Sequence, residues 1–333
     1  MKKSILCAAL AMTVLCGCTA QKAEKEEDMY NIDYMVLVNK LNPLPQDWEA
    51  NLKTEHFTNT VGNDVEVEIN AYREYLDLKK ELEDEGIYVD LDSARRSVEA
   101  QQEIMDNFTK EYGAEYAAKI VAQPGYSEHH TGLALDLYLI VDGKDIIYNE
   151  DLVTYPEIWE KIHEKLAAHG FILRYLPKKE HITGYAYEPW HIRYIQDREK
   201  AAEIMEKGIT LEGYLGAVRE TEPAIDLKTS GLYSREELEE MAVLIKCKAA
   251  SFTGCEMQSL TYAVDEGVSE EELKQINEAG EDIRYVKAVK FLMDFYASEE
   301  NSGVFNPGQD YSGYEWLLGC DEEGNWEIVS WGL

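Results

Sequence analysis

The stretch YSEHHTGLALDLYLI, from Tyr126 to Ile140, places two adjacent histidines and one aspartate beside an otherwise apolar run. The run LALDLYLIV is typical of a buried strand, and Gly132 just before it lets the chain turn sharply. An unpaired carboxylate in such a strand is costly, so Asp136 requires a partner for its charge. His129 lies seven residues earlier, across the turn, where it can point into the same pocket.

A second stretch, YEPWHIRYI, carries Glu188 and His191 around Pro189, just before another expected strand. Pro189 excludes a regular central strand at this point, so the two side chains need not lie on opposite faces. Two imidazoles and one carboxylate, from His129, His191 and Asp136, leave the open fourth position of a catalytic zinc site. The alternative is that Asp136 pairs with an arginine and that the histidines are incidental.

The motifs resemble those of the VanY-type zinc D-alanyl-D-alanine carboxypeptidases and their L,D-carboxypeptidase relatives. SEHHTGLALD is similar to the family pattern S-x-H-x-x-G-x-A-x-D, and EPWHIRY is similar to E-x-W-H-x-R-Y. A third segment, SARRSVEAQ, resembles S-x-Y-R-S-x-x-x-Q, with Arg95 where the family usually has tyrosine. His130 stands where glutamine is common, and we interpret it as a surface residue or a support for the neighbouring ligand. The resemblance covers roughly residues 30–217.

The resemblance implies one zinc ion per chain with three protein ligands, His129, Asp136 and His191. Zinc in such a site lowers the pKa of water from ~15.7 toward ~7. Glu188 is then implied as the general base that takes a proton from this water and passes it to the leaving amine. The alternative for Glu188 is a surface salt bridge.

For substrate binding, the resemblance points to Arg96, whose guanidinium would hold the free C-terminal carboxylate in a bidentate contact. Such a contact favours removal of one residue from a chain end. The neighbouring Arg95 could make the same contact, and Arg96 would then be an exposed helix residue. Gln101 and Ser127 would add polar contacts to the substrate end or, alternatively, be helix-surface and turn residues.

The implied function is removal of the C-terminal D-alanine from peptidoglycan stem peptides. The zinc motifs are shared with L,D-carboxypeptidases, so action on tetrapeptide stems is the main alternative. A D-Ala-D-Ala dipeptidase is a further alternative among enzymes. From another class, the chain could be a non-catalytic envelope-binding lipoprotein.

The resemblance implies an α+β fold, with a small zinc peptidase domain over residues 30–217 built on a central antiparallel sheet with flanking helices. Within it, Arg198 to Leu215 predicts a helix that Gly208 stops, followed by a short second turn. The polar stretch 218–232 is interpreted as a linker.

Residues 233–333 predict a second small α+β domain. Ser234 and Glu237 are spaced as a capping box at the start of a helix. Strand-like segments follow in the order CEMQSLTYAV, VKAVKFLMDFYA, YEWLLGCD and NWEIVSWGL. This tail resembles the cone-shaped domains of the cystatin or nuclear-transport-factor kind, and we interpret it as a binding or spacer module.

The N-terminus, MKKSILCAALAMTVLCGCTA, has a short basic region and an apolar run that is too short to span a membrane. The end of this run resembles a bacterial lipobox. We expect a signal peptide over residues 1–17, lipidation of Cys18 and a tether over residues 18–29. The alternative is an ordinary secretory signal with a chance cysteine. The protein is therefore expected outside the cytoplasm, anchored by its lipid to the bacterial cell membrane.

Charge and cysteine content exclude other classes of function. The formal net charge is −33, and such a surface repels nucleic acid. Beyond the signal, the chain has Cys247, Cys255 and Cys320, without the C-x-x-C spacing of a cysteine zinc site or redox motif. Whether these cysteines form a disulfide stays open at this point.

Overall fold

The computed structural model describes residue 30 and residues 32–112, 122–263, 268–279, 284–299 and 303–332. The predicted signal peptide, the lipidation site Cys18 and the tether up to residue 29 lie outside the described residues. Within these described ranges, no helix has the length and apolar character needed to cross a membrane.

An antiparallel sheet with the strand order β3-β4-β7-β6 carries two of the three predicted metal ligands, Asp136 on β4 and His191 on β7, and β5 pairs with β4. Its strands are β3 (Tyr88–Ser93), β4 (Ala134–Val141), β5 (Lys144–Ile146), β6 (Phe171–Leu173) and β7 (His191–Tyr194). A separate hairpin joins β1 (Thr54–Thr58) to β2 (Asp64–Glu68). Because β4 and β7 are neighbours, the two histidine motifs meet although they are far apart in the sequence.

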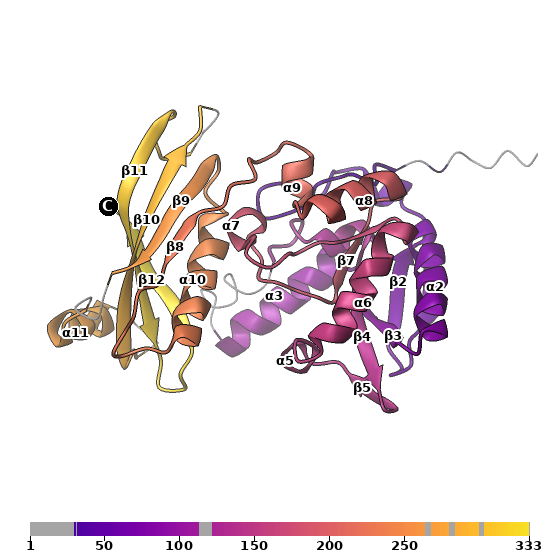
Figure 1. Cartoon of the computed structure of the whole chain (residues 1–333), viewed down its shortest axis with the longest axis horizontal. Helices are drawn as coiled ribbons and strands as arrows, with labels where there is room; N and C mark the ends of the chain where they lie inside the picture. Colours follow the sequence, from indigo (N-terminus) through magenta and orange to yellow (C-terminus); the bar gives the residue numbers. More distant parts are fainter. Residues whose placement is uncertain are drawn as a thin grey trace, which may run out of the picture. The chain divides into compact units, whose positions relative to one another are not determined.

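Helices flank this sheet (Figure 1). They are α1 (Trp48–Asn51), α2 (Ile69–Asp84), α3 (Val98–Tyr112), α5 (Asn149–Leu152), α6 (Pro156–Leu166), α7 (Glu180–Thr183), α8 (Arg198–Lys207) and α9 (Leu211–Tyr214), with 3-10 turns η1 (Glu128–Thr131) and η2 (Ala167–His169). Helix α2 contacts β3 and buries a stripe of residues at helical spacing, which are Ala71, Tyr75, Leu78 and Leu82. The predicted helix and short second turn are α8 and α9, and Gly208 ends α8 in the left-handed conformation.

A second sheet is built from the C-terminal part of the chain, in the order β12-β11-β10-β9-β8. Its strands are β8 (Ala224–Asp226), β9 (Cys255–Tyr262), β10 (Lys287–Ala297), β11 (Gln309–Cys320) and β12 (Trp326–Gly332). The last four correspond to the predicted strand segments. We call these strands, together with helices α10 (Arg235–Ala249) and α11 (Glu270–Ala279), the C-terminal sheet unit.

The core of the C-terminal sheet unit follows from two periodicities. Alternate residues of β10 (Val289, Phe291, Met293 and Phe295) are buried, as are α10 residues at helical spacing (Leu238, Met241, Ala242 and Ile245). The predicted capping box is present, because the Ser234 side chain accepts from the Glu237 backbone and the Glu237 side chain accepts from the Ser234 backbone. The α+β class, with an additional C-terminal sheet, is confirmed, while the domain boundaries and the cystatin-like comparison stay predictions.

The stretch predicted as a linker, 218–232, contains a strand. Residues Ala224–Asp226 form β8, which pairs in parallel with β9. The three side chains are exposed, so no hydrophobic pattern marks them as a strand. Backbone pairing with β9 decides their conformation.

Candidate metal centre and active site

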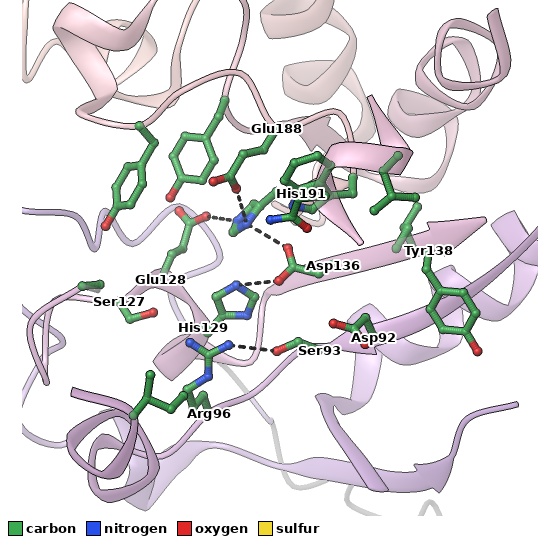
Figure 2. Close-up of a pocket in the computed structure, with 18 of the residues that line it drawn as sticks. Asp92, Ser93, Arg96, Ser127, Glu128, His129, Asp136, Tyr138, Glu188 and His191 are labelled. Atoms are coloured by element: carbon green, nitrogen blue, oxygen red, sulfur yellow. Dashed lines mark hydrogen bonds and ion pairs between the residues drawn. The ribbon is translucent and has the colours of Figure 1, made fainter. Parts of the chain in front are cut away.

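The predicted turn and strand around Asp136 are present and bring the two motifs together. His129 lies in η1, which ends at Gly132 with φ 72°, the left-handed region that favours glycine. Asp136 lies on β4, and its register partner across the sheet is His191, the first residue of β7. Figure 2 shows the side chains of His129, Asp136 and His191 pointing toward one another.

These three side chains form a cluster that could hold a metal ion. Nε2 of His129 lies 3.2 Å from Oδ2 of Asp136, and Nδ1 of His191 lies 3.1 Å from Oδ1 of Asp136. The possible ligand atoms all lie within 4.8 Å of one another. Ligand atoms at about 2.0–2.2 Å from a tetrahedral zinc ion lie roughly 3.3–3.6 Å apart, so the spacing suits zinc.

Contacts on the far side of each imidazole leave one nitrogen facing Asp136. Nδ1 of His129 donates to the backbone oxygen of Ala94 at 2.7 Å, and Nε2 of His191 lies 3.3 Å from Oε2 of Glu128. A metal-binding imidazole is neutral and carries one N–H, so with an ion bound Nε2 of His129 and Nδ1 of His191 would offer it their lone pairs. Such outer contacts are typical of metal-binding histidines.

One carboxylate oxygen of Asp136 is available to a ligand in the described structure. Its Oδ1 is buried and accepts no hydrogen bond within the described structure. Burial raises the pKa of this carboxyl group, but His129 and His191 hold the pKa well below its usual range. Among the described residues its ion-pair partners are these histidines, so the alternative of an arginine partner is wrong. An ionised carboxylate with an unsatisfied buried oxygen fits a divalent cation.

Glu188 lies beside this cluster because of a β-turn. The backbone N–H of His191 donates to the backbone oxygen of Glu188, and Pro189 occupies the position of the turn where proline is favoured. Oε2 of Glu188 therefore lies 3.5 Å from Nδ1 of His191. Burial raises the pKa of Glu188 to about 7, although His191 opposes the shift. The alternative of a surface salt bridge is wrong, because this carboxylate faces the cluster.

Arg96 reaches the same cavity from the loop between β3 and α3. Its backbone N–H donates to the oxygen of His129, and its side chain donates to Oε1 of Gln101 at 2.9 Å and to Oγ of Ser93 at 3.2 Å. No carboxylate lies within ion-pair distance of Arg96 among the described residues, so donor capacity remains for a ligand. Arg95 instead pairs with Glu66 at 2.7 Å and with a second glutamate, and it does not line the cavity.

Gln101 and Ser127 also line the cavity, but Gln101 has both of its polar groups engaged. Its oxygen accepts from Arg96, and its nitrogen donates to the oxygen of Ala122 at 2.7 Å. Gln101 thus supports the guanidinium directly. Ser127 precedes η1 and makes no capping hydrogen bond with its side chain. Its predicted contact with substrate stays a prediction.

The cavity that joins these residues has a volume of about 340 Å³. Its walls include Tyr175, Tyr185 and Trp190. Asp92 lines it as well, at a β-bulge where the register of β3 against β4 shifts between Leu91 and Ser93. Bulges commonly redirect a side chain beside an active site.

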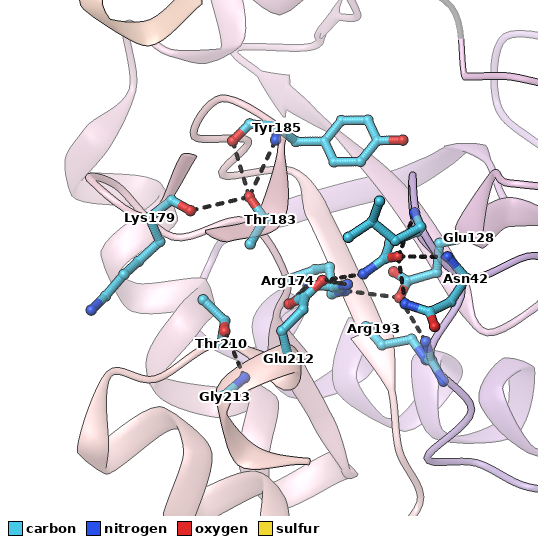
Figure 3. Close-up of polar contacts among 12 residues, drawn as sticks. Asn42, Glu128, Arg174, Lys179, Thr183, Tyr185, Arg193, Thr210, Glu212 and Gly213 are labelled. Atoms are coloured by element: carbon cyan, nitrogen blue, oxygen red, sulfur yellow. Dashed lines mark hydrogen bonds and ion pairs between the residues drawn. The ribbon is translucent and has the colours of Figure 1, made fainter. Parts of the chain in front are cut away.

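The sequence reasoning missed a buried ionic network behind the cluster (Figure 3). Oε1 of Glu128 accepts from Arg174 at 2.8 Å and from Arg193 at 2.6 Å, and Arg174 also makes two hydrogen bonds to Glu212. The side chains of Arg174 and Arg193 are 0% exposed. Burial raises the pKa of Glu128, but the two arginines hold it well below the usual range. Through the contact with His191, this network orients the imidazole.

The remaining histidines near the site lie outside the cluster. His130 is fully buried, contrary to the surface alternative, and its Nδ1 donates to the oxygen of Arg96 at 2.7 Å. It thereby supports the loop that carries Arg96. His163 contacts the oxygen of Pro189 at 2.9 Å, and His169 contacts Glu81.

Comparison with known proteins agrees with this geometry. Residues 64–197 match the family described as VanY: D-alanyl-D-alanine carboxypeptidase. A D-alanyl-D-alanine carboxypeptidase of Enterococcus faecalis is 36% identical over an alignment of 190 residues that covers 54% of this chain and 65% of the relative. The chain thus spans slightly less than two thirds of that relative's length. The putative carboxypeptidase YodJ of Bacillus subtilis is 34% identical over 197 residues, 56% of this chain and 68% of YodJ.

Among solved structures, a variant of a vancomycin resistance D,D-pentapeptidase VanY in complex with Zn(II) is similar to this chain. It is 34% identical, and the match covers 55% of this chain and 99% of the other, with a TM-score of 0.44.

Proposed function

The chain belongs to the VanY family of D-alanyl-D-alanine carboxypeptidases, and we propose that it removes the C-terminal D-alanine from peptidoglycan stem peptides with the help of one zinc ion. One observation carries this proposal. A single cavity contains a His–Asp–His donor set, a carboxylate beside it and an arginine that pairs with no carboxylate in the part of the chain that the structure describes. These are the groups that a carboxypeptidase needs to activate water and to hold the end of a chain.

In this proposal His129, Asp136 and His191 hold the zinc ion. When bound, zinc supplies a Lewis acid that polarises the scissile carbonyl and lowers the pKa of water toward about 7. Glu188 accepts a proton from the attacking water and delivers it to the leaving amine as the C–N bond breaks. Arg96 binds the substrate carboxylate, with Gln101 and Ser93 fixing the orientation of its guanidinium.

We expect Asp136→Ala to lose most of its zinc, because the substitution removes one of three ligands and the only anionic one. Elemental analysis of the purified protein checks this, with one zinc per chain expected for the wild type. Asp145→Ala, on the exposed strand β5, is the control and should keep its zinc. Full zinc occupancy in Asp136→Ala would remove Asp136 from the coordination sphere.

Arg96→Ala tests whether the enzyme recognises a free chain end. The lost charge-assisted contact is worth roughly 1.5–3 kcal/mol, so kcat/KM on a free-acid pentapeptide should fall about 10- to 150-fold. A pentapeptide amidated at its C-terminus should be a poor substrate for the wild type, and Arg96→Ala should lose little further on it. Equal cleavage of both peptides by the wild type would contradict the carboxypeptidase proposal and indicate an endopeptidase.

The proposal includes a location outside the cytoplasm, anchored to the bacterial cell membrane by lipid on Cys18. The basic start, the short apolar run and the lipobox-like end of the first 18 residues support it. We expect the protein made in bacteria to fractionate with membranes and Cys18→Ser to fractionate as soluble protein. Retention of the serine variant in membranes would show that lipid at Cys18 is not the anchor.

A further inference from the structure

The C-terminal sheet unit contacts the active-site half of the chain through a buried ion pair. Helix α10 packs against α7, and Nζ of Lys246 donates to Oε2 of Glu180 at 2.6 Å. The exposed fractions of the two side chains are only 11% and 6%. Surface lysines usually remain solvated, so a lysine held this way ties two elements together.

Helix α7 leads directly into the residues that line the cavity. It ends at Gly184 with φ 76°, and Nζ of Lys40 donates to the Gly184 oxygen at 2.5 Å. A Cβ on Gly184 would lie 3.0 Å from Cδ of Lys40 and 3.5 Å from the backbone oxygen of Cys247 on α10. The turn after α7 is therefore held between the loop with Lys40 and the end of α10.

From this turn, a chain of contacts reaches the candidate base. Nζ of Lys40 lies over the face of the Tyr185 ring, 4.7 Å from its centroid. The centroid of the Tyr185 ring lies 4.6 Å from that of the Tyr175 ring. The ring of Tyr175 lies 4.6 Å from His191, and the backbone N–H of Glu188 donates to the oxygen of Tyr175. A shift of α7 would thus move the groups around Glu188 and His191.

We propose that Lys246 is a positioning residue, through which the C-terminal sheet unit holds α7 and the following turn so that Tyr185 and Glu188 keep their places in the cavity. This inference rests on the proposed carboxypeptidase function. It assigns a catalytic contribution to a part of the chain beyond residues 64–197, which carry the family match. A displacement of about 1 Å at reacting groups can cost about 10²-fold in rate.

The test compares four variants for D-alanine release from a pentapeptide, zinc content and hydrogen exchange of residues 180–190. They are Lys246→Met, Lys246→Arg, the double variant Glu180→Gln/Lys246→Met, and the control Arg235→Met. Arg235 lies on the same helix and pairs with Glu239 at 2.8 Å, but both side chains of this pair are exposed. The double variant leaves no uncompensated buried charge, so it keeps the test valid if Lys246→Met alone does not fold.

We expect Lys246→Met and the double variant to lose about 10- to 100-fold in kcat, with KM changed less than threefold and zinc retained. Exchange at residues 180–190 should become faster in both, whereas Arg235→Met should match the wild type. Lys246→Arg should recover at least a third of the wild-type kcat. A double variant with wild-type kcat and unchanged exchange would overturn the inference.

The measurements distinguish a failure of the proposed carboxypeptidase function from a failure of the proposed role of Lys246. If the wild type releases no D-alanine, the proposed function is wrong, and hydrogen exchange alone then decides the role of Lys246. Faster exchange at residues 180–190 in the double variant would still support positioning by α10, and unchanged exchange would refute it.

Discussion

Glu188→Gln is expected to lower kcat by about 10²–10⁴-fold, the usual contribution of a general base. Glutamine keeps the size of the side chain and its place 3.5 Å from His191, but its amide cannot accept a proton from water. Zinc content and KM should therefore change little. Steady-state kinetics on a free-acid pentapeptide, with elemental analysis of the same sample, measure both quantities.

Glu160→Gln is the matched control for this substitution. Glu160 is exposed on α6 and does not line the cavity, so the variant should keep wild-type turnover. If Glu188→Gln retained more than a third of the wild-type kcat with full zinc, proton transfer would have to be assigned to another group.

Glu128→Gln is expected to lower the free energy of unfolding by about 3–5 kcal/mol, because it leaves the buried guanidinium of Arg193 without its carboxylate partner and Arg174 with Glu212 alone. Arg174 and Arg193 both donate to Glu128 and have no access to water. The same substitution weakens the contact that orients His191, so zinc affinity should fall about 10- to 100-fold. Urea unfolding and competition with a zinc chelator measure the two effects.

Glu239→Gln gives the comparison for an exposed pair. Glu239 pairs with Arg235 at the surface of α10, where such pairs contribute roughly 0–1 kcal/mol. If Glu128→Gln were no more destabilising than Glu239→Gln, the buried network would not be a structural support of the site.

The metal site could be predicted from the sequence because a charged residue interrupts an otherwise apolar strand. Asp136 inside an apolar strand required a partner, and the two histidine motifs offered it. The same reasoning applied to Arg174 in GFILRYL and Arg193 in HIRYI would have indicated two more buried charges. The sequence did not reveal that Glu128 is the shared partner of these arginines, because Glu128 looks like a turn residue beside His129.

Contacts between segments that are far apart in the sequence could not be predicted from local sequence patterns. Lys246 lies in a helix whose core residues, such as Met241 and Ile245, pack within the C-terminal sheet unit, and a lysine in such a helix is usually solvated. Its burial depends on α7, which precedes it by more than sixty residues. Strand β8 was missed for a similar reason, because its pairing with β9 and not its own side chains defines it.

Mass spectrometry of synthetic tri-, tetra- and pentapeptide stems, incubated with the soluble mature protein, tests the central proposal most directly. The proposal predicts that the pentapeptide ending in D-Ala-D-Ala becomes a tetrapeptide plus free alanine, and that Glu188→Gln leaves it intact. Conversion of the tetrapeptide to a tripeptide, with the pentapeptide untouched, would instead assign L,D-carboxypeptidase activity. Release of a dipeptide, or no cleavage of any stem by the zinc-loaded wild type, would contradict the proposed function.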